Sequence, residues 1–580
     1  MTDKRRKTKY LICFMAVWTV LMAAAFYFCT LKQGFHEDEY YTYYSTARTN
    51  GFYVEDGKWM DSETYRKEFV VLPGERFQYG LVKQVQSWDV HPPMYYWVFH
   101  TAASLVPGVF SKWIGLSINL LFHGINLILL TYLSYLVCER SGKTALFVTL
   151  FYGLTPAAMS GVVFIRMYEM LTVFVLLCAV LHVRAVQRLQ SEEGRGERLP
   201  AVRLLLPMAA VTYVGFLTQY YYFLFLFFMA IAFCSYLLWR DRNLYNCLRY
   251  GASQGIAFIL AYLTYPACLG QMFRGQRGAQ ATENFFDLSN TVTRFRFFFD
   301  LLDEYVFGNL LSVFLLLIVV LALAVYFRRH RRRADVWSGE MRADGGGQSG
   351  GMRADGGGQS GGMNEDGGWQ PAGRIIYGML LFTAAGYFFT VAKTALLLGN
   401  TSNRYQLPIY GIIILLLFWT IEGMWQSLAR IRHRCLPAAV AAVCLFIDLS
   451  GLHSDRVAFL YPQAGEAVAL AREQAAADIP VVYVYKPGEE WCVWAVADEL
   501  MEYDRVYFVS AASEDAITEP VIANADAVVS YTPRYDDLKE EEAQSMRIAS
   551  GNHKLSWEYL QYLHKYCIES YHCRERRRME

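Results

Sequence analysis

The feature that most constrains this chain is a series of long apolar segments. A helix of roughly 20 apolar residues spans the hydrocarbon core of a bilayer. Of the 580 residues, 54% are hydrophobic and 18% are charged, outside the usual range for a soluble enzyme. We expect a polytopic α-helical membrane protein with about eleven spans, near residues 10–30, 113–138, 143–160, 163–186, 203–219, 221–239, 250–268, 303–327, 374–396, 405–424 and 435–452.

Basic residues predict the orientation of these spans, because Lys and Arg concentrate in cytoplasmic loops. The first segment lacks a convincing cleavage site, which favours an anchor with its basic end in the cytoplasm. A shorter apolar segment, residues 95–107, is expected to be a re-entrant or surface helix; counting it as a span would send the later basic clusters outside. This topology places the N-terminus inside and the C-terminus outside. Five basic clusters then lie on the cytoplasmic side, the side of Lys4–Lys7: Arg140/Lys143, Arg184–Arg203, Arg240/Arg242/Arg249, Arg328–Arg333 and Arg430/Arg432/Arg434.

The same pattern divides the chain into a transmembrane region, residues 1–452, and a small extracytoplasmic α/β domain, residues 453–580. The α/β expectation rests on β-rich runs at 481–485, 506–509 and 527–531. Within the first region, 31–93 is expected to be an outer loop. Residues 334–373 are expected to be a flexible cytoplasmic linker, because they are glycine-rich and hold an 11-residue tandem repeat that starts at Met341 and again at Met352.

Charge and cysteine usage exclude several classes of function. A net charge of +1 argues against a nucleic-acid partner, because an evenly balanced chain would have to segregate its charges to present a basic face. The twelve cysteines lie mostly in apolar runs without a CxxC pair, which gives neither a disulfide framework nor a zinc site. Cys567 and Cys573 could form one bridge if that end lies outside the cell.

Polar residues that hydropathy does not explain gather on the predicted outer face. Glu37, Asp38 and Glu39 follow the first span directly, and their repulsion should raise at least one pKa unless a cation offsets it. Such a group suits a general base or a metal ligand, and the alternative is a solvated acidic rim. His91 stands before Pro92 and Pro93, at a rigid corner; the alternative is a helix start with an incidental histidine.

Ionisable residues near a span end usually face a cavity or a partner. Arg166 and Glu169 are three residues apart, so they could pair with each other or contact a lipid phosphate or a sugar. Arginines outside break the positive-inside pattern, so an anionic ligand such as phosphate or diphosphate on a lipid carrier is inferred for one or two of them. The other outer features are the tyrosines 220–222, more consistent with interface anchors, Arg274, Arg277, Arg294, Arg296, the Asp300/Asp303/Glu304 cluster, Lys393, and Asn403–Pro408.

In these motifs the chain resembles the multi-spanning glycosyltransferases of the GT-C class, in particular bacterial relatives of protein O-mannosyltransferases and of the lipid A aminoarabinose transferase. The motifs are Asp38-Glu39 after the first span, His91-Pro92-Pro93, Arg166-Met167-Tyr168, and Arg404-Tyr405 with Pro408 nearby. The resemblance covers roughly residues 1–450.

The resemblance implies an inverting transferase in a bacterial cell membrane that moves a sugar from a polyprenyl-phosphate donor to a lipid, protein or cell-wall polymer at the outer face. It implies that Asp38 is the base and that Glu39 orients it or helps to bind a metal. No cofactor is certain, although Asp38, Glu39 and His91 could hold a divalent metal. His91 stands where one branch has a phosphate-binding lysine, so Arg166 or Arg404 would fill that role. The substrate-binding candidates are His91, Arg166, Tyr168, Glu169, Lys393, Arg404 and Tyr405.

The leading alternative is a membrane transporter or lipid flippase, and a third is a non-catalytic scaffold. Transporters place coupling carboxylates near the midplane on repeated halves. Here the carboxylates follow the first span, and the two halves show no repeat. A scaffold would leave Asp38, Glu39 and His91 unexplained.

Overall fold

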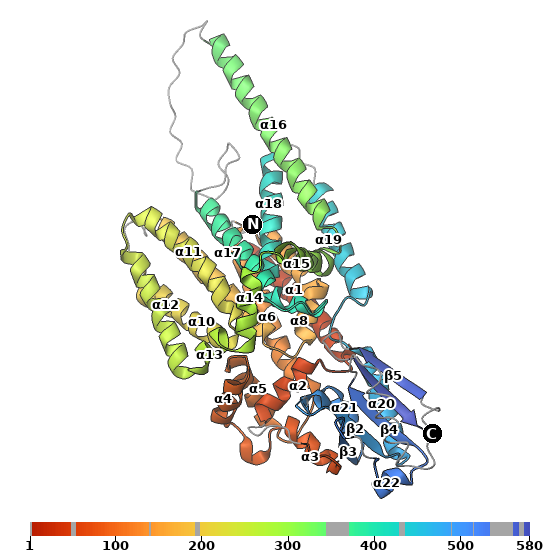
Figure 1. The fold of residues 1–580 in the computed structure, drawn as a ribbon. Coiled ribbons are helices and arrows are strands. Elements are labelled where there is room, and N and C mark those ends of the chain that lie inside the picture. Colours follow the sequence, from red (N-terminus) through yellow and green to blue (C-terminus); the bar gives the residue numbers. More distant parts are fainter. Residues whose placement is uncertain are drawn as a thin grey trace.

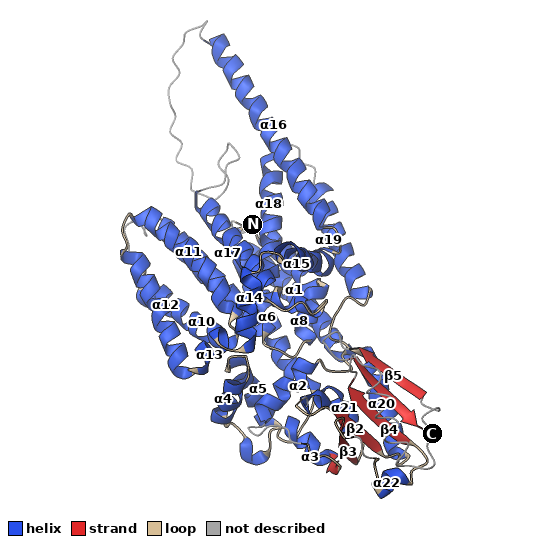
Figure 2. Ribbon diagram, in the orientation of Figure 1, coloured by secondary structure: helices blue, strands red, loops and turns tan. Residues whose placement is uncertain are grey.

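Helices make up most of the described structure, and several of them are long and apolar enough to cross a membrane (Figure 1, Figure 2). The computed structural model describes residues 3–47, 54–138, 141–191, 198–343, 371–428, 435–488, 490–513, 516–533, 561–567 and 573–579. Within these ranges eight helices are long and apolar enough to span a bilayer: α1 (Asp3–Leu31), α6 (Lys112–Val137), α9 (Tyr168–Gln190), α10 (Leu206–Thr218, extended by the π-helical turn Ala201–Leu205), α11 (Tyr221–Asp241), α16 (Leu311–Ala343), α17 (Pro371–Thr394) and α18 (Leu407–Leu428). The chain is therefore a multi-pass membrane protein, as the sequence predicts.

Two further predicted spans are bent by proline. α7 (Gly142–Leu154) meets α8 (Pro156–Val163) at 60°. Pro156 cannot donate to the preceding turn, so the helix restarts there. The Thr155 hydroxyl caps the new start by accepting a hydrogen bond from the Ala158 N–H at 3.2 Å. Likewise, α12 (Tyr245–Thr264) stops before Pro266 and turns by 102° into α13 (Ala267–Phe273) and α14 (Gln276–Phe286).

The eleven predicted segments thus correspond to eight spans, two bent pairs and α19 (Cys435–His453), whose apolar part is shorter. One predicted segment, 303–327, contains a break: α15 (Thr291–Phe307) ends at Gly308, where φ is +60°, and α16 starts again at Leu311. A residue in the left-handed region commonly ends a helix. The short segment at 95–107 forms α5 (Met94–Leu105), of 12 residues. Most of the linker and of its repeat, residues 344–370, lies outside the described residues.

The polar regions build a six-stranded sheet, ordered β1-β3-β2-β4-β6-β5. Its parallel centre consists of the three β-rich runs that the sequence predicts, β2 (Val481–Tyr485), β3 (Arg505–Ser510) and β4 (Val528–Pro533). β6 (Cys573–Met579) pairs antiparallel with β4 and with β5 (Gln561–Cys567). The backbones of Cys567 and Cys573 are paired across the β5–β6 ladder, and a bridge between them stays a prediction.

The outer edge strand, β1 (Lys58–Asp61), comes from the first loop and pairs antiparallel with β3. The loop and the C-terminal region therefore both contribute strands to one sheet, a contact that the sequence does not predict. Side chains strengthen the junction: the Tyr65 hydroxyl donates to the carbonyl of Val493 at 3.0 Å, and the Tyr44 ring packs on Trp494 at 4.3 Å between centroids. The remaining short elements are α2 (Glu37–Ala47), α3 (Ser62–Arg66), α4 (Tyr79–Trp88), α20 (Pro462–Ala476), α21 (Ala497–Leu500), α22 (Pro520–Ala523) and the 3-10 turns Lys67–Phe69, Pro73–Glu75, Thr401–Tyr405 and Glu490–Val496.

The most buried spans, α9 and α18, position the site. Arg166 lies just before α9, and Arg404 lies in the 3-10 turn just before α18. α2 to α5 and the sheet lie at one end of the helical bundle, opposite the free end of α16 (Figure 1). Arg166 and Arg404 therefore lie where the two central helices begin.

Candidate active site

The acidic motif forms the first turn of α2. Glu37, Asp38 and Glu39 are its first three residues, where carboxylates are favoured by the positive end of the helix dipole. The Glu39 carboxylate also accepts the backbone N–H of His36 at 2.5 Å, half of a capping box that fixes the start of the helix. The sequence therefore places Asp38 on a defined helical turn rather than on a loose loop.

Glu39 is held on the buried side of this turn. Its side chain is fully buried, with Oε2 at 2.9 Å from Lys32 Nζ and Oε1 accepting the backbone N–H of Ile165 at 2.7 Å. Lys32 Nζ also donates to the carbonyl of Phe459 at 2.7 Å. Both carboxylate oxygens of Glu39 are thus engaged, which suits a role in positioning α2.

Asp38 is the carboxylate that faces the site. Its side chain is 30% exposed, and Oδ2 lies 2.9 Å from Arg404 Nη1. Burial alone raises the pKa of Asp38, but the Arg404 and Arg166 guanidinium groups outweigh burial and hold the pKa below its usual value. Asp38 is therefore ionised at neutral pH.

His36 supports Asp38 as a neutral ring. Burial lowers the pKa of His36 to about 3. Accordingly, its Nδ1 accepts the backbone N–H of Asp38 at 3.0 Å, which an imidazolium could not do. The 3.6 Å approach of His36 Nδ1 to the Asp38 carboxylate is thus not an ion pair.

Arg166, which lies just before α9, binds the same turn of α2 through hydrogen bonds. Its Nη1 donates to the Asp38 carbonyl at 3.0 Å, to the Thr42 hydroxyl at 3.2 Å and to the Tyr96 hydroxyl at 2.9 Å. The side chain is buried, yet Nε has no hydrogen-bond partner. A buried guanidinium with an unused donor can bind an anion.

Glu169 does not pair with Arg166, although their spacing allowed it. Its Oε2 accepts a hydrogen bond from Asn126 Nδ2 at 2.7 Å and lies 3.3 Å from His123 Nδ1, all three side chains being buried between α6 and α9. Glu169 therefore lies in the helical interior, apart from the Asp38 turn.

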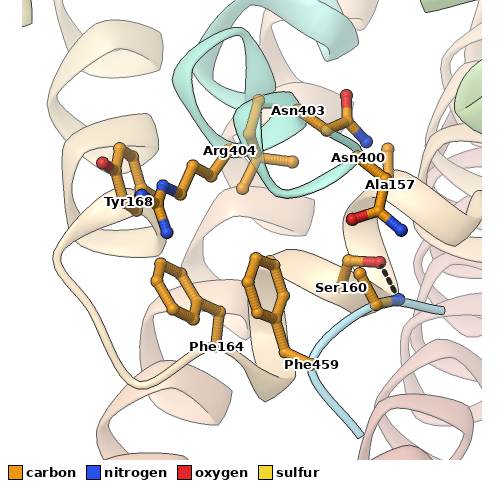
Figure 3. Close-up of a pocket in the computed structure, with 11 residues that line it drawn as sticks. Ala157, Ser160, Phe164, Tyr168, Asn400, Asn403, Arg404 and Phe459 are labelled. Carbon is orange, nitrogen blue, oxygen red and sulfur yellow. Dashed lines mark hydrogen bonds between the residues drawn. The ribbon is translucent and has the colours of Figure 1, made fainter. Parts of the chain in front are cut away.

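Arg404 completes the site and borders a pocket (Figure 3). Its Nη2 donates to the Tyr405 hydroxyl at 3.2 Å, and its guanidinium lies 5.0 Å from the centroid of the Phe164 ring. Nε has no hydrogen-bond partner, and Nη1 meets Asp38 without hydrogen-bond alignment. Tyr168 and Tyr405 pack edge to face at 5.9 Å beside it. The pocket is lined by Ala157, Ser160, Gly161, Phe164, Tyr168, Asn400, Asn403, Arg404, Leu407, Ala458 and Phe459.

His91 lies near this group at the start of α5. Burial and the Arg166 guanidinium hold the pKa of His91 well below its usual value, so its ring is neutral at neutral pH. A neutral ring does not replace the positive charge of a phosphate-binding lysine. Asp89, two residues earlier, is a second nearby carboxylate, and burial raises its pKa above the usual value.

Lys393 is not part of this cluster. Its Nζ donates to the Asp287 carbonyl and the Asn290 side chain, both at 2.6 Å, and to the Thr291 hydroxyl at 2.9 Å, which fixes the start of α15. Arg294, one of the arginines predicted to lie on the extracytoplasmic side, is buried and donates to the carbonyl of Ala392 at 2.9 Å. Both side chains therefore use their positive charge to bind backbone carbonyls of neighbouring segments.

The residues expected to hold a metal do not fit one well. Glu39 is engaged by Lys32 and by backbone, and the parts of the chain that the structure describes contain no group of three His, Cys, Asp or Glu side chains arranged for a metal ion.

The structure therefore brings together Asp38, His91, Arg166, Tyr168, Arg404 and Tyr405, and leaves Glu169 and Lys393 outside the cluster. Four residues at or beside the site were not among the candidates from the sequence: Lys32, Asp89, Phe164 and Phe459. A lysine one residue beyond a span looks like an ordinary flanking charge, and only Asp89, two residues before His91 in the same motif, carried a usable signal.

No family model and no curated protein matches the sequence. The structural comparison finds ArnT from Cupriavidus metallidurans bound to undecaprenyl phosphate, at 12% identity and a TM-score of 0.49, covering 99% of this chain and 98% of that one. It also finds the oligosaccharyltransferase AglB from Archaeoglobus fulgidus, in complex with an inhibitory peptide and a dolichol-phosphate, at 10% identity and a TM-score of 0.39, covering 93% of this chain and 71% of that one. These likenesses concern the fold alone, and at such scores they establish no shared function.

Proposed function

We propose that this protein is a membrane glycosyltransferase that moves a sugar from a polyprenyl-phosphate donor to an acceptor hydroxyl, with inversion at the anomeric carbon. One observation carries the proposal: an ionised, partly exposed aspartate lies between two buried arginines, each with an unused donor. A carboxylate beside anion-binding groups suits a reaction that removes a proton from one reactant and releases phosphate from the other.

In this reaction Asp38 accepts the proton of the acceptor hydroxyl as its oxygen attacks the anomeric carbon. The bond from that carbon to the phosphate oxygen breaks with its electron pair, and the lipid phosphate leaves with an added negative charge. Arg404 and Arg166 stabilise this charge through their unused donors. A phosphate bound at Arg404 also weakens the hold of Arg404 on Asp38, which makes the carboxylate a stronger base when the donor is present.

The sidedness that we propose places the site on the extracytoplasmic face of a bacterial cell membrane. The predicted cytoplasmic basic clusters include Arg328–Arg333, in the C-terminal half of α16, and the C-terminal end of α16 points away from α2 and the sheet (Figure 1). Because Lys and Arg favour the cytoplasmic side, the Asp38 end is outside. A lipid, protein or cell-wall polymer is the acceptor there.

A transporter is the second candidate, favoured by the buried Glu169–His123 contact between α6 and α9. Ionisable groups inside a span often mark an ion pathway. Such a function needs Glu169 and has no use for Asp38, so the two candidates make opposite predictions about these side chains.

Purified protein with a radiolabelled polyprenyl-phosphate sugar tests the proposal. Asp38→Asn keeps the shape and removes the base, so we expect transfer to fall by about 10²- to 10⁴-fold with folding intact. The matched control is the neighbouring Glu37→Gln, which should keep wild-type activity. Wild-type transfer by the Asp38→Asn variant would remove Asp38 as the base.

A further inference from the structure

The segment that joins the helical region to the sheet has an unusual backbone. Residues 455–461, here called the strap, connect α19 to α20. Within the strap, Asp455, Phe459 and Tyr461 have φ values of +42°, +67° and +49°. Aspartate tolerates this left-handed region, but bulky aromatic residues rarely adopt it. Strain of this kind persists where surrounding contacts impose it, and it concentrates at functional sites.

Three hydrogen bonds hold the strap against the helical region. The Phe459 carbonyl accepts from Lys32 Nζ at 2.7 Å, the Leu460 carbonyl accepts from the Gln33 N–H at 2.8 Å, and the Ala458 N–H donates to the Ser160 hydroxyl at 2.9 Å. Lys32 is fully buried and also holds Glu39. Lys32 therefore holds both the helical turn that carries Asp38 and the backbone of Phe459.

With the strap held in this way, the Phe459 ring lies in the lining of the pocket that Arg404 also borders. The ring stacks on Phe164 with 4.1 Å between centroids and 20° between planes, and the Arg404 guanidinium lies over the same Phe164 ring (Figure 3). Leu407 and the small residues Ala157 and Gly161 complete the apolar part of the lining. The pocket thus joins an anion-binding group to an apolar wall.

We propose that Phe459 is a specificity-determining residue that contacts the first isoprenyl unit of the lipid donor, next to the phosphate held by Arg404. This inference rests on the proposed function and extends it, because it gives the C-terminal region a part in donor binding. The pairing of an apolar wall with a guanidinium matches an isoprenyl phosphate better than a polar acceptor. Lys32 acts through Phe459 and Glu39, as a positioning residue.

Steady-state kinetics of the full-length protein test this inference with Phe459→Ala and with the milder Phe459→Leu, which retains apolar volume. We expect Phe459→Ala to raise KM for the donor about tenfold or more, with a smaller rise for Phe459→Leu and an unchanged KM for the acceptor. The matched control is Phe508→Leu, at a buried aromatic that packs on Tyr483 in the sheet, away from the pocket. It should lower thermal stability without changing donor KM. An unchanged donor KM in both Phe459 variants, or a rise confined to the acceptor, would overturn the inference.

A binding measurement separates this inference from the transfer reaction. Farnesyl phosphate should raise the melting temperature of the wild type more than that of Phe459→Ala, whereas inorganic phosphate, which lacks the isoprenyl group, should act equally on both. Equal shifts with farnesyl phosphate contradict the role of Phe459. If the wild type binds farnesyl phosphate through Phe459 but transfers no sugar, the subsite stands and the proposed transferase activity fails.

Discussion

At the scale of single residues, three adjacent carboxylates have different environments because a helix turns by about 100° per residue. Glu39 faces inward onto Lys32, whereas Asp38 faces Arg404 and remains partly exposed. The sequence predicted that repulsion in this motif raises at least one pKa unless a cation offsets it. It could not show which carboxylate each cation would reach, because Arg404 is more than 360 residues away along the chain.

The low pKa of Asp38 predicts how transfer depends on pH. Burial raises this pKa, but the positive charges near the carboxylate, Arg404 first and Arg166 next, together lower it more, so Asp38 stays ionised until the pH falls below its usual value of 3.8. The acidic limb due to Asp38 should therefore lie below that pH. Since the depressed pKa also favours folding, the associated stability is present above pH 3.8 and is lost as the pH falls through the folded-state value.

Arg404→Gln should move this acidic limb to higher pH, because burial, which raises the pKa of Asp38, is then opposed by less positive charge. The profile of kcat/KM against pH, measured beside the surface variant Arg472→Gln, checks the shift. An unmoved limb in Arg404→Gln would show that Arg404 does not set the ionisation of Asp38. The same variant should raise donor KM; unchanged donor kinetics would remove Arg404 from phosphate binding.

At the scale of elements, the buried Lys32–Glu39 pair anchors α2 between α1 and the strap. Lys32→Met leaves an unpaired buried carboxylate and should reduce the free energy of unfolding by about 3–5 kcal/mol. Adding Glu39→Gln removes the second charge, so the double variant should recover most of that loss. Chemical denaturation in detergent measures Lys32→Met, Glu39→Gln and the double variant. Losses that simply add would mean that the two side chains are not coupled.

Hydropathy predicted where most spans lie, because each must bury about 20 apolar residues in lipid. It could not predict how a span bends. Pro156 lies inside an apolar run and splits it into α7 and α8, and Gly308 separates α15 from α16. The three central strands were predictable from their β-branched and aromatic residues. The pairing of β1 with β3 was not, because it joins Lys58–Asp61 to a strand more than 440 residues later.

At the scale of the whole molecule, this pairing places the first loop and the C-terminal region on the same side of the membrane. The proposed sidedness then requires the 341–362 repeat to lie on the opposite side. A membrane-impermeant thiol reagent added to intact cells should label Lys58→Cys and should reach Ser349→Cys only after permeabilisation. Labelling of Ser349→Cys in intact cells would reverse the proposed sidedness.

The proposed transferase activity is best tested by identifying the lipid-linked sugars that accumulate when the protein is absent. We predict that cells lacking it accumulate one polyprenyl-phosphate sugar, that wild-type protein returns this lipid to its normal level, and that Asp38→Asn does not. If no such lipid accumulates, or if Asp38→Asn clears it as well as the wild type, the protein is not a transferase that uses Asp38 as its base.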